Sequence, residues 1–189
     1  MVKRDSYMER LIHSMWNGEI KVITGIRRCG KSVLLFDLFF EYLLSQNVSE
    51  DHILKIELDQ RRYYKFRNPI TLCEYVESTV RDRKDEKFYL FIDEVQLTTK
   101  VVDKENGGIE VTIYDMLNEL KAYKNLDVYV TGSNSKGLSK DIATEFRGRA
   151  TQIHVFPLSF AEFYSAVGGD ERKALDTYDV VSVKFRRTA

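Results

Sequence analysis

A glycine-rich stretch between two apolar segments carries the clearest chemistry in this sequence. Residues 25–32 read GIRRCGKS, which is a glycine, four variable residues, a glycine, a lysine and a serine. The backbone amides of such a loop wrap phosphate oxygens, and the start of the following helix adds partial positive charge. Gly25 and Gly30 permit a close approach of the backbone that a side chain would block. The stretch therefore predicts a phosphate-binding loop.

Lys31 and Ser32 supply the side-chain chemistry of this loop. The Lys31 ammonium is placed to reach the terminal phosphates of a nucleotide, and Ser32 offers a hydroxyl to Mg²⁺. We expect the nucleotide to contact nine consecutive residues, namely Gly25, Ile26, Arg27, Arg28, Cys29, Gly30, Lys31, Ser32 and Val33.

Two adjacent acids end the apolar stretch FYLFIDE at residues 88–94. In a parallel sheet, ligands lie at the carboxyl ends of the strands. Asp93 is then expected to hold Mg²⁺, directly or through water, and Glu94 to polarise the attacking water. The alternative is that the two acids only mark the exit of a strand to the surface. Because a phosphate loop precedes them, we favour the catalytic interpretation.

Two further segments offer polar groups to the same site. VYVTGSNS closes the next strand with Thr131, Ser133 and Asn134, and a polar residue there can sense the γ-phosphate or the lytic water. An ordinary turn explains the same residues, since Gly, Ser and Asn favour turns. We favour Asn134 slightly over Ser133 as the sensor.

TEFRGR places Arg147 and Arg149 before the last predicted strand. An arginine there can neutralise charge in a phosphoryl-transfer transition state. Two ordinary surface arginines explain the pair equally well, so both interpretations stay open.

Alternating strand-like and helix-like segments are expected to position these residues. The strands are expected at Ile20–Thr24, His52–Asp59, Lys87–Glu94, Asp127–Ser133 and Thr151–Phe156. The helices are expected at Gly30–Ser45, Ile70–Arg83, Thr112–Lys124 and Ser139–Arg149. Strands separated by helices pair in parallel through right-handed crossovers, so the fold class is a three-layer α/β sandwich. Thr98–Glu110 is expected to be a loop, either a mobile excursion above the sheet or a long connection.

Composition excludes several other classes of protein. The 189 residues carry 29 Lys and Arg against 29 Asp and Glu, so net charge gives no support for nucleic-acid binding. Cys29 and Cys73 form no metal or disulfide spacing, which suits a reducing compartment. Charged residues near the N-terminus argue against a signal peptide, and no apolar run is long enough to span a membrane. These features favour a cytoplasmic protein.

Taken together, four segments resemble a known family. GIRRCGKS, FIDEVQ, YVTGSNSKGLSKDIATEFRGR and FPLSFAEF are similar to the AAA-type ATPases of bacteria and archaea, relatives of the signal-transduction ATPases with numerous domains. The resemblance implies a P-loop NTPase with a five-stranded parallel sheet in the order 5-1-4-3-2. It also implies ATP rather than GTP, with Mg²⁺ as cofactor. By the same resemblance Lys31, Ser32, Asp93, Glu94, Asn134 and one of Arg147 and Arg149 match functional positions.

The resemblance also sets the expected domain organisation. Residues 1–166 are expected to form the ATPase core, and 167–189 a short tail, because the tail does not read as the helical lid and nuclease-like region that usually follow in this family. A protein partner or an effector domain acting in trans would then do the downstream work.

The leading functional hypothesis is Mg²⁺-dependent ATP binding and hydrolysis used as a conformational switch. The isolated chain is expected to be slow and to exist as a monomer or a weak homo-oligomer. The alternatives are a nucleotide-binding module with little turnover, a small-molecule kinase and a DNA-associated ATPase. A kinase usually lacks the acidic pair at Asp93 and Glu94, and the neutral charge argues against DNA.

Overall fold

A parallel sheet of five strands forms the centre of the molecule, in the order β2-β3-β6-β1-β7. The computed structural model describes residues 4–104, 107–133 and 150–166. The strands are β1 (Ile20–Thr24), β2 (Ile53–Glu57), β3 (Phe88–Asp93), β6 (Leu126–Gly132) and β7 (Ala150–His154). This numbering includes two strands outside the sheet. Counted among themselves in chain order, the five strands have the expected order 5-1-4-3-2.

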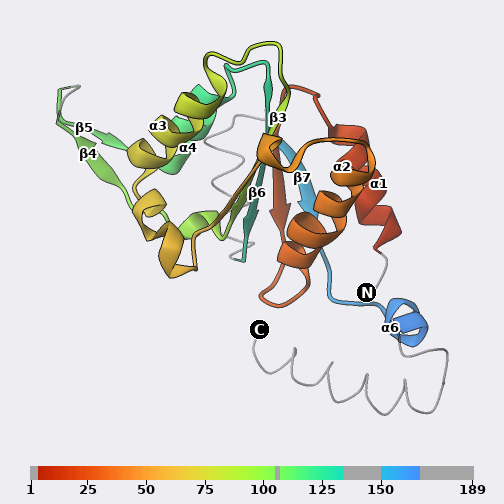
Figure 1. The fold of residues 1–189 in the computed structure, drawn as a ribbon. Coiled ribbons are helices and arrows are strands. Elements are labelled where there is room, and N and C mark those ends of the chain that lie inside the picture. Colours follow the sequence, from red (N-terminus) through yellow and green to blue (C-terminus); the bar gives the residue numbers. More distant parts are fainter. Residues whose placement is uncertain (1–3, 105–106, 134–149, 167–189) are drawn as a thin grey trace.

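Helices cover both faces of the sheet, so the predicted three-layer α/β sandwich is confirmed. The α-helices are α1 (Asp5–Ser14), α2 (Phe40–Ser45), α3 (Pro69–Val80), α4 (Ile113–Leu120) and α6 (Phe160–Ala166). A π-helix, Val33–Phe39, precedes α2, and short 3₁₀ turns occur at Glu50–His52, Arg61–Arg67 and Val95–Leu97. Helices α3 and α4 lie on one side of the sheet, while α1 and α2 lie on the other (Figure 1).

Alternating side chains of the strands divide the core into two clusters. Val22, Leu90 and Val130 belong to the cluster beneath α3 and α4. Their neighbours Ile23, Phe91 and Tyr129 belong to the cluster beneath α1 and the π-helix. The central strands β3 and β6 are buried along their whole length because both of their faces are covered. Packing on both faces therefore holds the carboxyl ends of β3 and β6 in fixed positions.

Local capping fixes where the helices of one face begin. Asn68 Oδ1 accepts from the Ile70 amide at 3.0 Å, and Pro69 occupies the first turn of α3, where its missing N–H costs nothing. Thr112 and Asp115 form a reciprocal capping box at the start of α4. In the described ranges, no helix is long and apolar enough to cross a membrane.

Several elements differ from the sequence-based expectations. The expected loop Thr98–Glu110 contains an antiparallel pair, β4 (Val101–Asp103) and β5 (Ile109–Val111), which projects away from the sheet (Figure 1). Each of the two strands has three residues, which is too short for an alternation of apolar and polar side chains to indicate a strand. The helix that follows the phosphate loop is π-helical over Val33–Phe39 rather than α-helical. Helix α1, before β1, and helix α6, after β7, are not among the predicted helices. The expected helix Ser139–Arg149 lies outside the described residues.

Candidate functional site

The topology brings three chain segments to one edge of the sheet. Strands β1 and β3 both flank β6 in parallel, so all three carboxyl ends face the same way. The loop at residues 25–32 leaves β1, Asp93 ends β3, and Ser133 follows β6. This edge is the expected ligand-binding edge of a parallel sheet.

Gly25 is required by the close packing of the loop. A Cβ at this position would lie 2.3 Å from the Val155 carbonyl oxygen and 2.7 Å from Cys29 Sγ, and the Gly25 φ is +154°. No side chain fits there without moving the backbone after β7. Further along the loop, Arg28 and Gly30 adopt positive φ values of 65° and 94°, which bends the loop into its compact form.

Lys31 points back into the loop. Its side chain is buried, with 4% exposure, and its ammonium donates to the carbonyl oxygens of Gly25 at 3.2 Å and Ile26 at 3.1 Å. Carbonyl oxygens compensate a buried positive charge only in part. The geometry therefore presents a cation that gains by exchanging these carbonyls for phosphate oxygens.

Asp93 is joined to both neighbouring segments by hydroxyl groups. Ser32 Oγ donates to Asp93 Oδ2 at 2.7 Å, and Thr131 Oγ1 donates to Asp93 Oδ1. Burial raises the pKa of the Asp93 carboxyl, while the hydrogen bonds from Thr131 and Ser32 oppose part of that rise. A hydroxyl and a carboxylate in contact are an oxygen donor set that suits Mg²⁺.

Thr131 has a positioning role that the sequence only hinted at. Its side chain is completely buried, and its hydroxyl also accepts the backbone amide of Glu94 at 3.2 Å. One hydroxyl therefore fixes Asp93 through its side chain and Glu94 through its backbone. The sequence alone groups Thr131 with the sensor residues, because it lies at the end of a strand.

Glu94 lies at the mouth of the site and is half-buried. Its carboxylate accepts the backbone amide of Ser133 at 3.3 Å, so it faces the end of β6. Asp93 and Glu94, adjacent in sequence, therefore occupy different surroundings, the first enclosed by hydroxyls and the second open toward solvent.

The remaining predicted residues fall into two groups. Ile26 is half-buried and Cys29 is buried, whereas Arg27, Arg28 and Val33 are exposed at the loop surface. Asn134, Arg147 and Arg149 lie outside the described residues, so their predicted roles stay predictions. Of the two sensor candidates, only Ser133 lies in the described part of the chain.

Arg4 supports the loop from behind, and sequence reasoning missed it. This arginine is buried, with 5% exposure, and it donates to the carbonyl oxygens of Cys29 at 3.3 Å and Phe156 at 2.6 Å. Its Nε lies 3.1 Å from Glu162 Oε1 of α6 as an ion pair without good hydrogen-bond alignment. A lone arginine in a charged N-terminal segment gives no signal of such burial.

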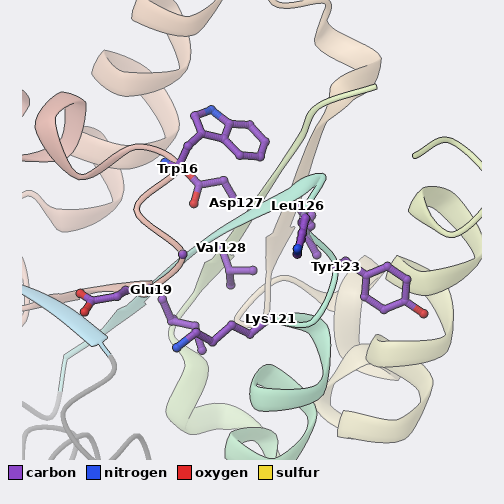
Figure 2. A pocket seen from close by; sticks show the side chains of 10 residues that line it. Trp16, Glu19, Lys121, Tyr123, Leu126, Asp127 and Val128 are labelled. Atoms are coloured by element: carbon purple, nitrogen blue, oxygen red, sulfur yellow. The ribbon is translucent and has the colours of Figure 1, made fainter. Parts of the chain in front are cut away.

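A separate pocket lies at the opposite edge of the sheet (Figure 2). Its volume is about 280 Å³, and it is lined by residues at the amino ends of β1 and β6, including Glu19, Leu126 and Val128. Behind it the buried Lys21 ammonium donates to Asp127, which also accepts the Tyr129 hydroxyl at 2.8 Å. None of the predicted site residues in the described part of the chain lines this pocket, so it is distinct from the phosphate loop.

Comparison with known proteins identifies the family. A family model described as an AAA domain matches residues 17–164. An uncharacterized protein of Haemophilus influenzae is 32% identical over 175 residues, which cover 93% of this chain and 40% of that protein. An uncharacterized protein of Methanocaldococcus jannaschii is 28% identical, covering 85% of this chain and 32% of that protein. The chain therefore spans two fifths or less of the length of these relatives.

Solved structures share the fold at low sequence identity. The Walker-type ATPase of Pyrococcus abyssi superposes with a TM-score of 0.58 at 16% identity, covering 95% of this chain and 63% of that one. Caenorhabditis elegans PCH-2 superposes with a TM-score of 0.53 at 16% identity, covering 78% and 37% respectively. The Aeropyrum pernix ORC2 protein gives 0.52 at 11% identity, covering 87% and 48%. At such identities, the likeness is one of fold alone.

Proposed function

Because the chain belongs to the AAA domain family, we propose that it binds ATP with Mg²⁺ at the loop Gly25–Val33 and hydrolyses it. The observation that carries this proposal is the hydrogen bond of 2.7 Å between Ser32 Oγ and Asp93 Oδ2. It joins the start of the helix after the phosphate loop to the end of β3, two segments that have no other reason to place polar side chains together.

Binding rests on the loop backbone and on Lys31. The amides of residues 25–32 surround the phosphates, and the Lys31 ammonium leaves its two carbonyl partners for phosphate oxygens. Ser32 and Asp93 would hold Mg²⁺, which supplies charge neutralisation for the phosphates when it is bound. Ionised Asp93 is unfavourable in its buried position alone, so a neighbouring cation favours its charged form.

Hydrolysis rests on Glu94. Its carboxylate takes a proton from the water whose oxygen attacks the γ-phosphorus, and the bond from that phosphorus to the bridging oxygen breaks to release ADP. The half-buried carboxylate can be reached by solvent water, unlike enclosed Asp93. The different surroundings of the two acids support the division of roles.

We further propose that hydrolysis works as a conformational switch. The Ser133 amide, at the end of β6, donates to the Glu94 carboxylate. Loss of the γ-phosphate beside Glu94 would therefore change the conformation of the chain after β6 first. Asn134 is proposed as the sensor. Residues 1–166 are proposed as the ATPase core and 167–189 as a tail, with the downstream work left to a partner.

Arg147 or Arg149 is proposed as the arginine that neutralises transition-state charge. An isolated chain would be slow if this arginine acts on a neighbouring subunit. Mixing the double variant Arg147→Ala, Arg149→Ala with Lys31→Ala distinguishes the two arrangements. Recovery of turnover on mixing supports action between subunits, and no recovery at any concentration supports action within one chain.

Phosphate release tests the proposed hydrolysis. The chain should release phosphate from ATP only with Mg²⁺. Adding small-molecule acceptors should not reduce the phosphate released, whereas a kinase would transfer the γ-phosphate to the acceptor. Glu94→Gln should bind ATP with unchanged affinity while turnover falls by about two to four orders of magnitude. Glu41→Gln, an exposed glutamate on α2, is the matched control. Parental turnover in Glu94→Gln would refute the role of Glu94.

A further inference from the structure

Gln96 closes a small ring of hydrogen bonds around the Glu94 carboxylate. Gln96 Nε2 donates to Glu94 Oε2 and also to Ser133 Oγ, the latter at 3.1 Å. The Ser133 amide donates to the same Glu94 oxygen at 3.3 Å. The ring therefore joins the chain after β3 to the end of β6.

The backbone of Glu94 brings Gln96 into this position. Glu94 adopts left-handed φ and ψ of 53° and 51°, which is unfavourable for a residue with a side chain and persists only where the surroundings impose it. The chain then enters the 3₁₀ turn Val95–Leu97, in which Val95 is buried at 1% exposure and Leu97 N donates to Glu94 O at 2.9 Å. This turn returns the side chain of residue 96 to that of residue 94.

The chemistry of the partners fixes the orientation of the Gln96 amide. A carboxylate accepts hydrogen bonds only, so the NH₂ group of Gln96 must face Glu94. Both donors reach Oε2, and within residues 4–104, 107–133 and 150–166 no hydrogen bond reaches Oε1. One carboxylate oxygen is thus held in place by two donors, while the described residues place no donor on the oxygen that would accept the proton.

We propose that Gln96 is a positioning residue that orients Glu94 as the general base. The proposal rests on the proposed function, because it concerns the group that takes the proton from water. Gln96 is exposed, so packing of the core does not account for its placement. Its two contacts serve the carboxylate and the strand end that carries the sensor candidates.

Gln96→Leu is the decisive variant because leucine keeps much of the side-chain volume and removes the NH₂ donors. We expect kcat to fall about tenfold to hundredfold, the scale on which a misplaced catalytic group slows a reaction. The dissociation constant for ATP should stay within about twofold, since the hydrogen bonds of the Gln96 side chain among the described residues go to Glu94 and Ser133 and not to the phosphate loop. Gln46→Leu is the matched control, because Gln46 is an exposed glutamine that also donates to a serine hydroxyl, at 3.3 Å and far from the site.

A double-variant comparison shows whether Gln96 acts through Glu94. In the Glu94→Gln background the base is gone, so Gln96→Leu should cause no further loss of residual turnover. An equal loss in both backgrounds would overturn the proposal, as would a parental kcat for Gln96→Leu alone. A weakened ATP affinity in Gln96→Leu would also overturn it, since that result indicates general damage to the site.

A spectroscopic measurement separates failure of this proposal from failure of the proposed function. In ¹⁵N-labelled wild-type chain the Gln96 side-chain amide should resonate away from the position of free glutamine, and Glu94→Ala should return it there. Unchanged Gln96 signals in Glu94→Ala would show that the contact does not exist and would overturn the inference directly. A wild-type chain that shows the contact and binds ATP without hydrolysing it would instead refute the proposed hydrolysis, and with it the role of Gln96 in turnover.

Discussion

Ser32 Oγ and Asp93 Oδ2 lie 2.7 Å apart, so a hydrogen bond joins the start of the helix after the phosphate loop to the end of β3. The carboxylate at this contact is 5% exposed, and burial raises its pKa. If Asp93 served packing alone, a neutral residue of the same size could replace it without a loss of folding stability. The position of Asp93 between the hydroxyl groups of Ser32 and Thr131 instead suits the binding of a cation beside it.

The first prediction is that Asp93→Asn stabilises the nucleotide-free protein at high pH. The raised pKa means that the folded chain binds the Asp93 proton more tightly than the unfolded chain does. This contribution to stability is fully present below the unfolded pKa of about 3.9 and is lost as the pH rises through the raised folded value. Asparagine has no charge to bury, so its advantage should be larger at pH 8 than at pH 4.5. The difference should be smaller than the full value of about 1.4 kcal/mol for each unit of pKa shift, because pH 4.5 already lies above the unfolded pKa.

Urea unfolding of both chains at the two pH values measures this difference. The experiment is done without nucleotide or Mg²⁺, and added MgATP should then stabilise the wild-type chain more than Asp93→Asn. An advantage for asparagine that is equal at pH 4.5 and pH 8 would contradict the burial of a titrating carboxyl group at this position.

The second prediction is that Lys31→Ala weakens ATP binding by one to two orders of magnitude. Hydrogen bonds made by a charged group contribute about 1.5–3 kcal/mol, and Lys31 is the buried cation of the loop. Titration calorimetry measures the affinity. Lys84→Ala removes an equal charge at an exposed position before β3 and should leave the affinity unchanged. Equal affinities for wild type and Lys31→Ala would rule out Lys31 as a phosphate ligand.

The third prediction is that both cysteines react slowly with a thiol reagent in the folded protein. Cys29 and Cys73 are free and buried. Burial raises the pKa of the Cys73 thiol to about 12 and also raises that of Cys29, although Lys31 opposes the second shift. At pH 8 only about one Cys73 in ten thousand is then a thiolate, the form that reacts.

The reagent is dithiobis(nitrobenzoate), and the absorbance of the thionitrobenzoate that it releases measures the reaction. Both thiols should react at once in denaturant, and alkylated Cys29 should block ATP because its sulfur packs under Gly25. Rapid reaction of one thiol in the folded chain would identify a site that opens to solvent.

The part of the site at the carboxyl ends of the strands could be predicted, because the sequence patterns that indicate it are local. A β-branched run before Gly25 and a buried run before Asp93 each end in chemistry-bearing residues, and parallel pairing brings such ends together. The contact between Ser32 and Asp93 follows from those two facts. The expected strand order came from the family resemblance, since no local pattern specifies which strands are neighbours.

Other features depend on contacts that no local pattern encodes. The β4–β5 hairpin has strands of three residues each, too short for alternation to stand out from a loop. The double role of the Thr131 hydroxyl depends on the register of β6 against β3. Gln96 belongs to the quoted segment FIDEVQ, yet only the left-handed turn at Glu94 brings it back to the carboxylate.

The last prediction concerns the buried arginine behind the phosphate loop. Arg4 ties the Cys29 carbonyl of the loop to the Phe156 carbonyl and to Glu162 of α6. Removing buried Arg4 leaves two carbonyl oxygens and a half-buried carboxylate without their partner, so Arg4→Leu should destabilise the folded chain by on the order of 3 kcal/mol. The loop also loses its support on the side away from the nucleotide. ATP affinity should therefore fall together with stability. Arg10→Leu is the matched control, because Arg10 also lies on the N-terminal segment and donates to one carbonyl, that of Gln152 at 3.0 Å, but does so at an exposed position.

The cost of Arg10→Leu should stay below about 1 kcal/mol, as for other exposed polar contacts. Glu162→Gln, which keeps the shape and removes the charge, tests the ion pair by itself and should cost less than Arg4→Leu, since the two carbonyl contacts of Arg4 remain. Urea unfolding and ATP titration of the three variants measure both effects. If Arg4→Leu lost stability but bound ATP with parental affinity in conditions where it is folded, Arg4 would serve the packing of α6 and not the shape of the loop.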